Sequence, residues 1–268
     1  MKHLTIPKSI DPLEYRILLS VVLNKSMEWV FMHLPNLQLN DTQNANLEGL
    51  LNRRLKGEPI AKIVGYKEFY GRNFITNSHT LDPRPDSETL IDAVLKNFPK
   101  EDSYKILDLG LGTGCLLFTL LCELPLSYGV GIDFSYEALK VAQENQYNLG
   151  LETRSICLQG NWANPVSGKF DIIVCNPPYI NNAEVLDLST LHDPHSALFS
   201  GKTGLEAYQQ IMPQLKSLLK GTGKIFFEIG KGQELCVEKI ALDNGLHSEG
   251  VFLDLSGTTR VLCYRASL

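Results

Sequence analysis

The residues best suited to chemistry form the run Asn176-Pro177-Pro178-Tyr179, which directly follows a predicted strand over residues 170–175. Two consecutive prolines fix the backbone there and remove two N–H donors, so the carbonyl groups point outward without competition. An asparagine side-chain oxygen and a proline carbonyl make two acceptors, and a planar NH2 group offers two donors. The run therefore predicts a site that binds an amide or an aromatic amine.

The nitrogen of such an NH2 group is a poor nucleophile, because its lone pair is delocalised. When both hydrogens are held and the lone pair is aimed at an electrophilic methyl group, positioning and charge stabilisation carry the reaction. The ring of Tyr179 then supplies a flat wall on which the planar group stacks. The alternative interpretation of the same run is a proline-rich turn that only closes a strand.

A second candidate site is the glycine run Gly110-Leu111-Gly112-Thr113-Gly114, which lies between a predicted strand and a predicted helix. Small residues there let the backbone approach a ligand at a helix N-terminus. Asp133 ends the next predicted strand, where a carboxylate accepts hydrogen bonds from ribose hydroxyls. A dinucleotide fingerprint would place its third glycine where this chain has Cys115. The run therefore favours a nucleoside site of another kind, the alternative being a glycine-rich turn without a ligand.

The elements that position both sites alternate between strand and helix after Lys105. We expect strands at 106–109, 128–132, 155–158, 170–175, 224–229, 250–255 and 260–264, and helices at 115–123, 135–148, 205–220 and 233–244. This alternation argues for an α/β fold with a parallel, doubly wound sheet, which binds ligands at the carboxyl ends of its strands. No helical run separates the last two strands, which predicts an antiparallel pair at one edge.

The N-terminal part of the chain has a different pattern. Apolar residues recur at helical spacing from Asp11 to Leu55, which predicts a small helical bundle with N-caps at Asp11 and at Asn40 or Asp41. Short apolar runs broken by glycines predict a hairpin-like connector over residues 57–80.

The prolines of the segment Pro83-Arg84-Pro85 exclude a helix there, and Asp86 or Ser87 is then expected to cap a helix that runs through Leu95. We divide the chain into a helical domain at 1–56, the connector at 57–80 and a sheet domain at 81–268.

Composition and charge restrict the class of protein. The 268 residues are 44% hydrophobic and 21% charged, which is typical of a globular protein and excludes collagen-like, coiled-coil and mostly disordered chains. The net charge of -5 does not favour binding of duplex nucleic acid by overall charge. The longest apolar stretch without a charged residue, Leu109 to Cys122, is shorter than the roughly 18 residues that span a bilayer. We expect neither a membrane span nor, from Met1 to Lys8, a secretory signal.

The cysteines are scattered and lack the spacing of metal ligands. We expect reduced core thiols of a cytoplasmic protein and no metal site. His192 and His195 are three residues apart without a further His or Cys nearby, and we interpret them as loop residues. The six cysteines are Cys115, Cys122, Cys157, Cys175, Cys236 and Cys263.

The glycine run, Asp133 and Asn176-Pro177-Pro178-Tyr179 resemble those of S-adenosylmethionine-dependent amino methyltransferases, which include adenine-specific DNA and RNA enzymes and protein glutamine methyltransferases. From about Asp11 to Tyr264 the chain resembles one branch, the PrmC/HemK family. That family methylates the glutamine of the Gly-Gly-Gln motif in class I peptide-chain release factors. The further residues that carry this resemblance are Arg53-Arg54, Gly57-Glu58-Pro59, Gly65, Glu68-Phe69, Pro83-Arg84-Pro85, Ala197-Leu198, Gly204-Leu205, Glu228-Ile229-Gly230, Gln233, Asp254, Gly257 and Arg260.

The resemblance implies a Rossmann-like seven-stranded methyltransferase sheet, preceded by a helical bundle that docks the release factor and by a β-hairpin connector. It implies S-adenosylmethionine as methyl donor, the N5 nitrogen of the glutamine as acceptor, and neither a metal nor a direct nucleic-acid substrate. The implied cofactor-binding residues are Gly110, Leu111, Gly112, Thr113, Gly114, Asp133, Trp162 and Asn176. The implied substrate-binding residues are Asn176, Pro177, Pro178 and Tyr179, and of these Asn176, Pro177 and Tyr179 are the catalytic ones.

The chain departs from the family pattern at a few positions. Asn161 replaces the acid that usually precedes Trp162, so a carboxylate contact to the adenine amine would become an amide contact. Asp86 and Ser87 stand where the family prefers Glu and Thr. The remaining departures are Lys62 for an aromatic residue, Asp82 for an apolar one and Asp193 for Glu.

Two other functions remain open from the sequence. One is an adenine or other amine methyltransferase, which a basic cleft around Asn176 would favour. The other is a non-catalytic cofactor-binding or scaffold protein, for which Asn161 is the only reason. Arg84 is either structural, tying the bundle to the sheet, or close to the active site.

Overall fold

The computed structural model describes residues 6–266 of the chain. They form two compact units: the first contains the residues up to Tyr66 together with Leu186–His192, and the second contains Lys67–Val185 and the residues from Asp193 onward. The finer division into domains at 1–56, 57–80 and 81–268 stays a prediction.

The first unit is built from short amphipathic helices, as the apolar spacing predicts. They are α1 (Pro12–Leu23), α2 (Met27–His33), α3 (Asp41–Leu55) and α4 (Ile60–Val64), with a 3₁₀ turn at Leu34–Asn36. Asp11 caps α1 by accepting the Leu13 amide, and Asn40 forms a capping box with Gln43 at the start of α3. The buried core of the unit consists of Ile10, Tyr15, Leu18, Leu19, Val30, Leu47 and Ile63.

The hairpin-like connector is correct only in its second half. Residues 60–64 form the helix α4, which begins after Pro59 and ends at Gly65 with a left-handed φ of 86°. Five apolar or lysine residues are too few to distinguish helix from strand by periodicity. The hairpin itself is formed by β1 (Tyr66–Phe69) and β2 (Arg72–Ile75). Its two loop residues, Tyr70 and Gly71, both have positive φ, as a tight turn matching the strand twist requires.

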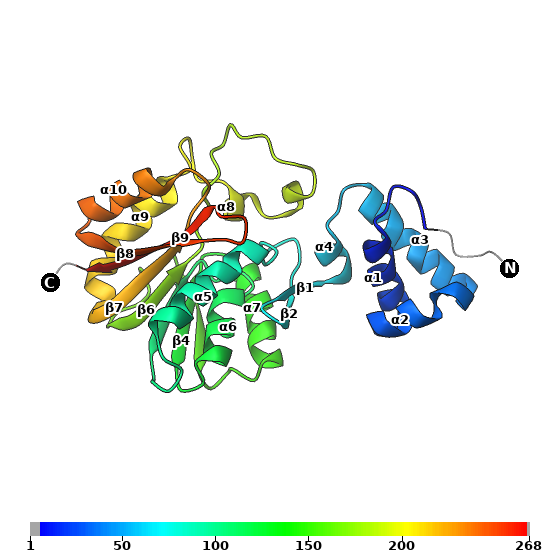
Figure 1. The fold of residues 1–268 in the computed structure, drawn as a ribbon, viewed down its shortest axis with the longest axis horizontal. Coiled ribbons are helices and arrows are strands. Elements are labelled where there is room, and N and C mark those ends of the chain that lie inside the picture. The colour runs from blue at the N-terminus through cyan, green and yellow to red at the C-terminus, as the bar shows by residue number, and fades with distance from the viewer. Residues whose placement is uncertain (1–5, 267–268) are drawn as a thin grey trace. The chain divides into compact units, whose positions relative to one another are not determined.

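The second unit contains a seven-stranded sheet within the described residues, in the order β5-β4-β3-β6-β7-β9-β8 (Figure 1). Strands β3 to β7 pair in parallel, whereas β9 pairs antiparallel with both β7 and β8. This confirms the fold class and the antiparallel edge. The strands are β3 (Lys105–Leu109), β4 (Tyr128–Asp133), β5 (Ser155–Gln159), β6 (Phe170–Cys175), β7 (Leu219–Glu228), β8 (Leu246–Leu253) and β9 (Thr259–Ala266).

Helices cover both faces of this sheet, because its central strands are apolar on both sides. In β6, Ile172 and Val174 belong to one buried cluster with α5, α6 and α7, whereas Ile173 and Cys175 belong to another with α9 and α10. The two groups of helices lie on opposite faces in Figure 1. The helices are α5 (Glu88–Asn97), α6 (Cys115–Glu123), α7 (Tyr136–Asn148), α8 (His195–Leu198), α9 (Glu206–Leu215) and α10 (Glu234–Asp243).

Strand β7 is longer than the sequence indicates. The predicted helix at 205–220 is wrong at its end, because α9 stops at Leu215 and a 3₁₀ turn at Lys216–Leu218 leads into β7. The strand then passes through Gly221 and Gly223, two residues that usually weaken a strand. At Gly223 the reason is a close backbone approach, since a Cβ there would lie 2.8 Å from the Phe170 carbonyl oxygen. Strand β8 likewise begins at Leu246, before the predicted residue 250.

Among residues 6–266, no single helix is long and apolar enough to cross a membrane. Helix α1 and the segment Met27–Asn36 together have the length and apolar composition of a span, but the two are bent by 103° relative to each other.

The two glycines of β7 provide a test of this strand. We expect Gly223→Ala to lower the free energy of unfolding by about 1–3 kcal/mol, because the added methyl group overpacks against the Phe170 carbonyl. Gly221→Ala is the matched control: its Cβ meets no atom within 4 Å, so we expect a change within about 0.5 kcal/mol. Urea denaturation of both variants measures the difference, and equal stabilities would contradict the described path of β7.

Candidate active site

The sheet brings the two chemically interesting runs to one edge. Strand β3 lies between β4 and β6, and Leu109 at its end pairs with Ile132 on one side and Cys175 on the other. The residues that follow these three positions are Gly110, Asp133 and Asn176. They therefore meet where a doubly wound sheet places its ligands.

The glycine run forms a tight turn between β3 and α6. The amides of Gly110 and Leu111 both donate to the Ile132 carbonyl, and the Gly112 amide donates to Asp133 Oδ2 at 2.8 Å. Gly114 has a φ of 80°, and a Cβ there would lie 2.1 Å from the ring of Phe118. Only glycine fits this position, so the last residue of the run serves the packing of α6 against the loop.

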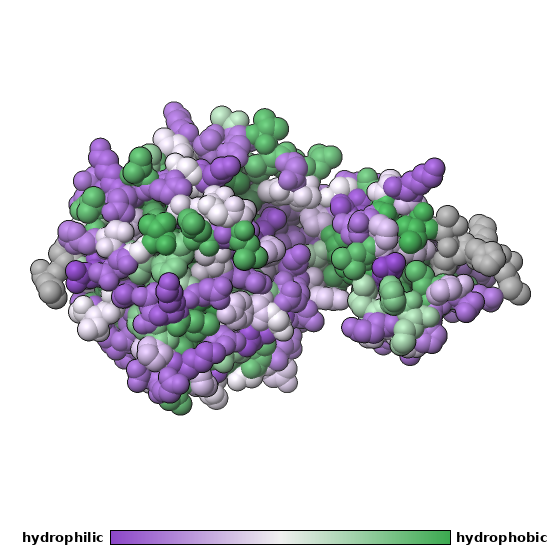
Figure 2. Space-filling model, in the orientation of Figure 1, coloured by the Kyte–Doolittle hydropathy of each residue, from purple (hydrophilic) through white to green (hydrophobic). Residues whose placement is uncertain are grey.

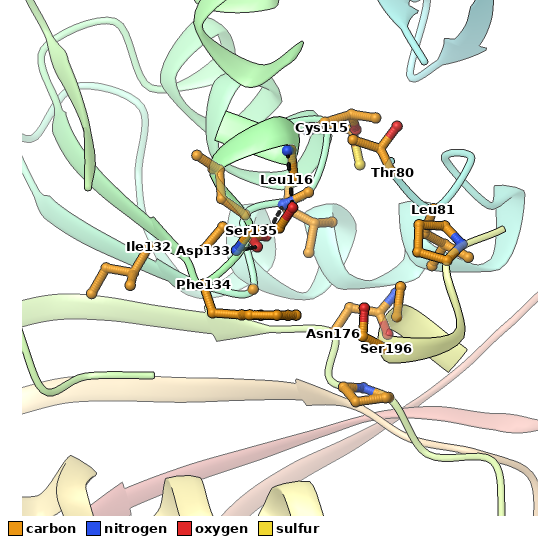
Figure 3. A pocket seen from close by; sticks show the side chains of 18 of the residues that line it. Thr80, Leu81, Cys115, Leu116, Ile132, Asp133, Phe134, Ser135, Asn176 and Ser196 are labelled. Carbon is orange, nitrogen blue, oxygen red and sulfur yellow. Dashed lines mark hydrogen bonds between the residues drawn. The ribbon is translucent and has the colours of Figure 1, made fainter. Parts of the chain in front are cut away.

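Asp133 ends β4 with both carboxylate oxygens already hydrogen-bonded. Oδ2 accepts from Gly112 and Oδ1 accepts from the Ser135 amide at 2.9 Å. A carboxylate has about four lone-pair sites, so each oxygen keeps an acceptor position for a ligand hydroxyl. Burial nevertheless raises the pKa of Asp133 above its ordinary value. Figure 3 shows these bonds on one side of a cavity and the Asn176 side chain on the other.

This cavity has a volume of about 280 Å³ and collects most of the predicted residues. Gly110, Leu111, Gly112, Thr113, Asp133, Trp162, Asn176 and Pro178 line it, whereas Gly114, Pro177 and Tyr179 are not among the lining residues. A Cβ on Gly110 would lie 3.7 Å from the Trp162 ring and 3.9 Å from the Asn176 carbonyl oxygen, in the space between them. A carboxylate, an aromatic ring and a bare glycine therefore surround a space suited to a nucleoside.

Trp162 adopts a left-handed backbone with a φ of 50°, which is rare for a bulky residue. Its indole N–H donates to Gln210 Oε1 at 3.2 Å, so α9 helps to fix the ring. Such backbone strain is typical of functional sites. Asn161, the departure from the family pattern, also lines the cavity.

The Asn176 side chain is hydrogen-bonded to the hydroxyl of Ser87. Its Nδ2 donates to Ser87 Oγ at 3.2 Å, and Ser87 Oγ donates to Glu228 Oε2 at 2.5 Å. The Tyr179 hydroxyl donates to the other oxygen of Glu228 at 3.5 Å. Ser87 is the N-cap residue of α5, as one of the two predicted alternatives, but its side chain makes no capping hydrogen bond, and its hydroxyl donates to Glu228 instead.

Glu228 is a site residue to which the sequence assigned no role. It is the last residue of β7 and follows three apolar residues, and it is 1% exposed. Burial raises its pKa to about 7, against the opposing effect of the Ser87 hydrogen bond. A carboxylate at the buried carboxyl end of a strand was the signal that could have identified it.

Of the two roles that the sequence left open for Arg84, the structure supports a position close to the candidate site, because the ion pair that it forms lies within the second unit. Its guanidinium forms an ion pair of 2.5 Å with Asp193, whose side chain is buried, and Arg84 also lines the cavity. The Asp82 amide donates to Asp193 Oδ1 at 3.3 Å, so two departures from the family pattern contact each other. These bonds hold the segment before α5 at the cavity.

Further cavity residues were not predicted. Phe134 is exposed beside Asp133, and the segment around α8 contributes polar and small side chains. The ring of His195 stacks on Phe199. No group of three or more His, Cys, Asp or Glu side chains within residues 6–266 is placed to hold a metal ion. The unpredicted lining residues include Thr80, Leu81, Leu116, Phe134, Ser135, Ser196, Ala197 and Gln210.

Two family models match the chain. That of the PrmC N-terminal domain matches residues 8–65, and that of the Methyltransferase small domain matches residues 85–193. A release factor glutamine methyltransferase of Agrobacterium fabrum is 36% identical over 272 residues, which cover 98% of this chain and 94% of that protein. The chain belongs to the release factor glutamine methyltransferase family.

Some relatives of this family member are longer. A bifunctional methyltransferase of Rickettsia felis is 42% identical over 287 residues, which cover 96% of this chain but 54% of that protein. The chain thus spans about half the length of the Rickettsia relatives that it matches.

A solved structure shares the fold. The catalytic domain of hMettl16, in complex with MAT2A 3'UTR hairpin 6, has a TM-score of 0.59 at 16% identity and covers 87% of this chain and 84% of that one. Such a distant likeness shows the methyltransferase fold alone.

Proposed function

We propose that this chain methylates the side-chain amide nitrogen of the glutamine in the Gly-Gly-Gln motif of class I peptide-chain release factors, with S-adenosylmethionine as methyl donor. The observation that carries the proposal is that Asn176, at the carboxyl edge of the sheet, lines the same cavity as Asp133 and Trp162. Asn176 and the carbonyl of Pro177, which follows it, are the proposed acceptor pair. Membership in the family supports the same substrate. Because the Rickettsia relatives are about twice as long, the activity and partners of the whole protein are part of this proposal.

The cavity residues suit the parts of this cofactor. Asp133 keeps acceptor positions for ribose hydroxyls, the Trp162 ring offers a face for adenine, and the glycine run lets the backbone approach the methionine part. When bound, S-adenosylmethionine supplies an electrophilic methyl group. The part of the protein is to exclude water from this space and to hold the acceptor nitrogen beside it.

Asn176 Oδ1 and the Pro177 carbonyl then accept the two hydrogens of the substrate amide. The nitrogen gains positive charge as its bond to the methyl carbon forms and the bond from that carbon to the donor sulfur breaks, leaving its electron pair on sulfur. The charge on nitrogen spreads onto the hydrogens that the two oxygens hold. These acceptors are thus better matched to the transition state than to the ground state. One of the two hydrogens leaves as a proton, which water takes. Tyr179 is the wall against the planar amide in this proposal.

The helical domain is proposed to dock the release factor. It carries exposed apolar side chains, with Phe31 66% and Met32 68% exposed, and Figure 2 shows apolar residues among polar ones on its visible face. Exposed apolar groups of this kind are typical of protein interaction surfaces. A cytoplasmic location belongs to the same proposal, and the six cysteines, all free thiols, are consistent with a reducing compartment.

Radiolabelled S-adenosylmethionine tests the substrate directly. We expect label on a purified class I release factor and none on its Gln→Ala variant in the Gly-Gly-Gln motif, because the variant lacks the acceptor nitrogen. Duplex DNA and an RNA hairpin, incubated in parallel, should stay unlabelled. Label on a nucleic acid alone would establish the amine methyltransferase alternative instead.

Asn176→Ala tests the acceptor pair. We expect kcat for transfer to fall by a factor of about 10²–10³, as when one charge-stabilising hydrogen bond is removed from a preorganised site. The dissociation constant for S-adenosylmethionine should change little in calorimetry. Asn148→Ala, an exposed asparagine at the end of α7, is the matched control and should keep the parental rate. Transfer at the parental rate by Asn176→Ala would refute the assigned role.

Trp162→Ala tests the adenine site. Loss of an aromatic face against a base costs about 1–3 kcal/mol, so we expect the dissociation constant for S-adenosylmethionine to rise roughly 5- to 150-fold. Trp29→Ala is the control, because Trp29 stacks on His33 within the helical unit. Isothermal titration calorimetry measures both variants, and an equal effect of the two would contradict the proposed place of adenine.

A further inference from the structure

A buried hydrogen-bond relay connects the substrate side of the cavity to the interior of the sheet. It runs from Asn176 Nδ2 to Ser87 Oγ at 3.2 Å and from Ser87 Oγ to Glu228 Oε2 at 2.5 Å. Ser87 is 2% exposed and Glu228 is 1% exposed, although 141 residues of sequence separate them. The relay thus joins the loop after β6, the 3₁₀ turn Pro85–Ser87 and the end of β7.

The chemistry of these groups gives the relay a direction. An ionised carboxylate only accepts hydrogen bonds, so the single proton of the Ser87 hydroxyl must point to Glu228. The Ser87 oxygen then has only lone pairs to offer to Asn176, and the NH2 end of the Asn176 amide must face it. The Oδ1 end is turned away from Ser87, and it has no hydrogen-bond partner among residues 6–266.

We propose that Ser87 and Glu228 are positioning residues that fix which end of the Asn176 amide faces the substrate. This inference rests on the proposed function, in which Asn176 Oδ1 must accept a hydrogen from the substrate amide. An asparagine amide turned by 180° would present two N–H donors to the substrate NH2 group and could not hold it. The relay excludes that orientation.

Tyr179 is placed by the same carboxylate. Its hydroxyl donates to Glu228 Oε1 at 3.5 Å, and its backbone carbonyl accepts from Gln233 Nε2 at 2.9 Å. A Cβ on Gly230 would lie 3.0 Å from the Tyr179 ring, so the ring fits closely against the turn after β7. Glu228 therefore contacts both proposed substrate-binding residues. Its Oε2 reaches Asn176 through Ser87, and its Oε1 accepts from the Tyr179 hydroxyl.

The charge of Glu228 depends on the groups around it. The cation facing it is Arg260 of β9, which also forms ion pairs with Asp86 at 3.0 Å and Asp254 at 3.1 Å. Burial and the negative charge of Asp86 raise the pKa of Glu228, while Ser87, Arg260 and the Tyr179 hydroxyl lower it, and the result is about 7. The buried Cys175 thiol, whose pKa this charge helps to raise, is neutral in this range.

Protonation of Glu228 therefore releases the relay. A neutral carboxylic acid can donate to Ser87 Oγ, and the Ser87 hydroxyl is then free to donate to Oδ1 of a turned Asn176. The relay fixes Asn176 above the pKa of Glu228 and loses its direction as the pH falls through about 7. Methyl transfer should decline over the same interval.

The first test observes Asn176 without any release factor. Its side-chain NH2 resonance in ¹H–¹⁵N spectra, assigned by its loss in Asn176→Ala, should titrate with a midpoint near 7. In Glu228→Gln, which keeps the shape but cannot ionise, this titration should vanish. Glu144→Gln, an exposed residue of α7, is the control and should titrate like the parent. A titration that persists unchanged in Glu228→Gln would overturn the proposal.

The second test measures transfer to the release factor between pH 5.5 and 8.5, a range of about 1.5 pH units on either side of the Glu228 pKa. We expect Ser87→Ala to lower kcat about tenfold with little change in the dissociation constant for S-adenosylmethionine, and Ser87→Thr, which restores the hydroxyl, to recover most of the loss. The acidic decline of the parent should be absent in Glu228→Gln. Parental kcat in Ser87→Ala would also overturn the proposal, and this smaller substitution remains informative if Glu228→Gln does not fold.

The two tests separate the two proposals. If the parent transfers no methyl group to the release factor at any pH while the Asn176 resonance titrates as expected, the proposed function is wrong and the relay stands. If transfer occurs but neither variant alters the resonance or the pH profile, the function stands and the relay is wrong.

Discussion

The parallel pairing of β3 with β4 on one side and with β6 on the other is the constraint on which the site depends. Since Leu109 pairs with both Ile132 and Cys175, the chain leaves three neighbouring strands at one level of the sheet. Gly110 and Asn176 follow directly after β3 and β6, and Asp133 is the last residue of β4, so no loop separates the strand pairing from these residues. A shift of one residue in either pairing would turn the side chains of a strand to the opposite face and separate the two sides of the cavity.

The sequence predicts those parts of the molecule that local patterns encode. Strand runs bounded by Gly, Asp or Pro are visible without tertiary information, and several of the residues at their ends line the cavity. The sequence does not predict the helix at 60–64, because five residues are too few to show a helical period. It does not predict the start of β7 either, because the glycine at position 223 is required by the close approach of the Phe170 carbonyl on another strand. Ser87 looked like a helix cap, and nothing local connects it to Glu228. The roles of Asn176, Pro177 and Tyr179 stay predictions.

Three of the buried carboxylates belong to strands of the sheet near its carboxyl edge, namely Asp108 in β3, Asp133 at the end of β4 and Glu228 at the end of β7. Burial raises the pKa of each, to about 8 for Asp108. Asp108 accepts from the Leu117 amide through Oδ2, while its Oδ1 has no partner in the described chain. Buried acids are costly for stability, and their concentration at one edge is typical of a fold that gives up stability for a site.

The acceptor pair cannot by itself choose between a glutamine amide and an adenine. Both present a planar NH2 group with two hydrogens, and an asparagine oxygen and a proline carbonyl hold either one equally well. The proposed relay through Ser87 and Glu228 orients Asn176 but adds no contact that distinguishes the two substrates. Selectivity must therefore come from residues that contact the rest of the substrate. The helical unit, which the PrmC N-terminal model matches, is the part of this chain that fits a protein partner. The net charge of -5 points the same way, because it disfavours binding of nucleic acid.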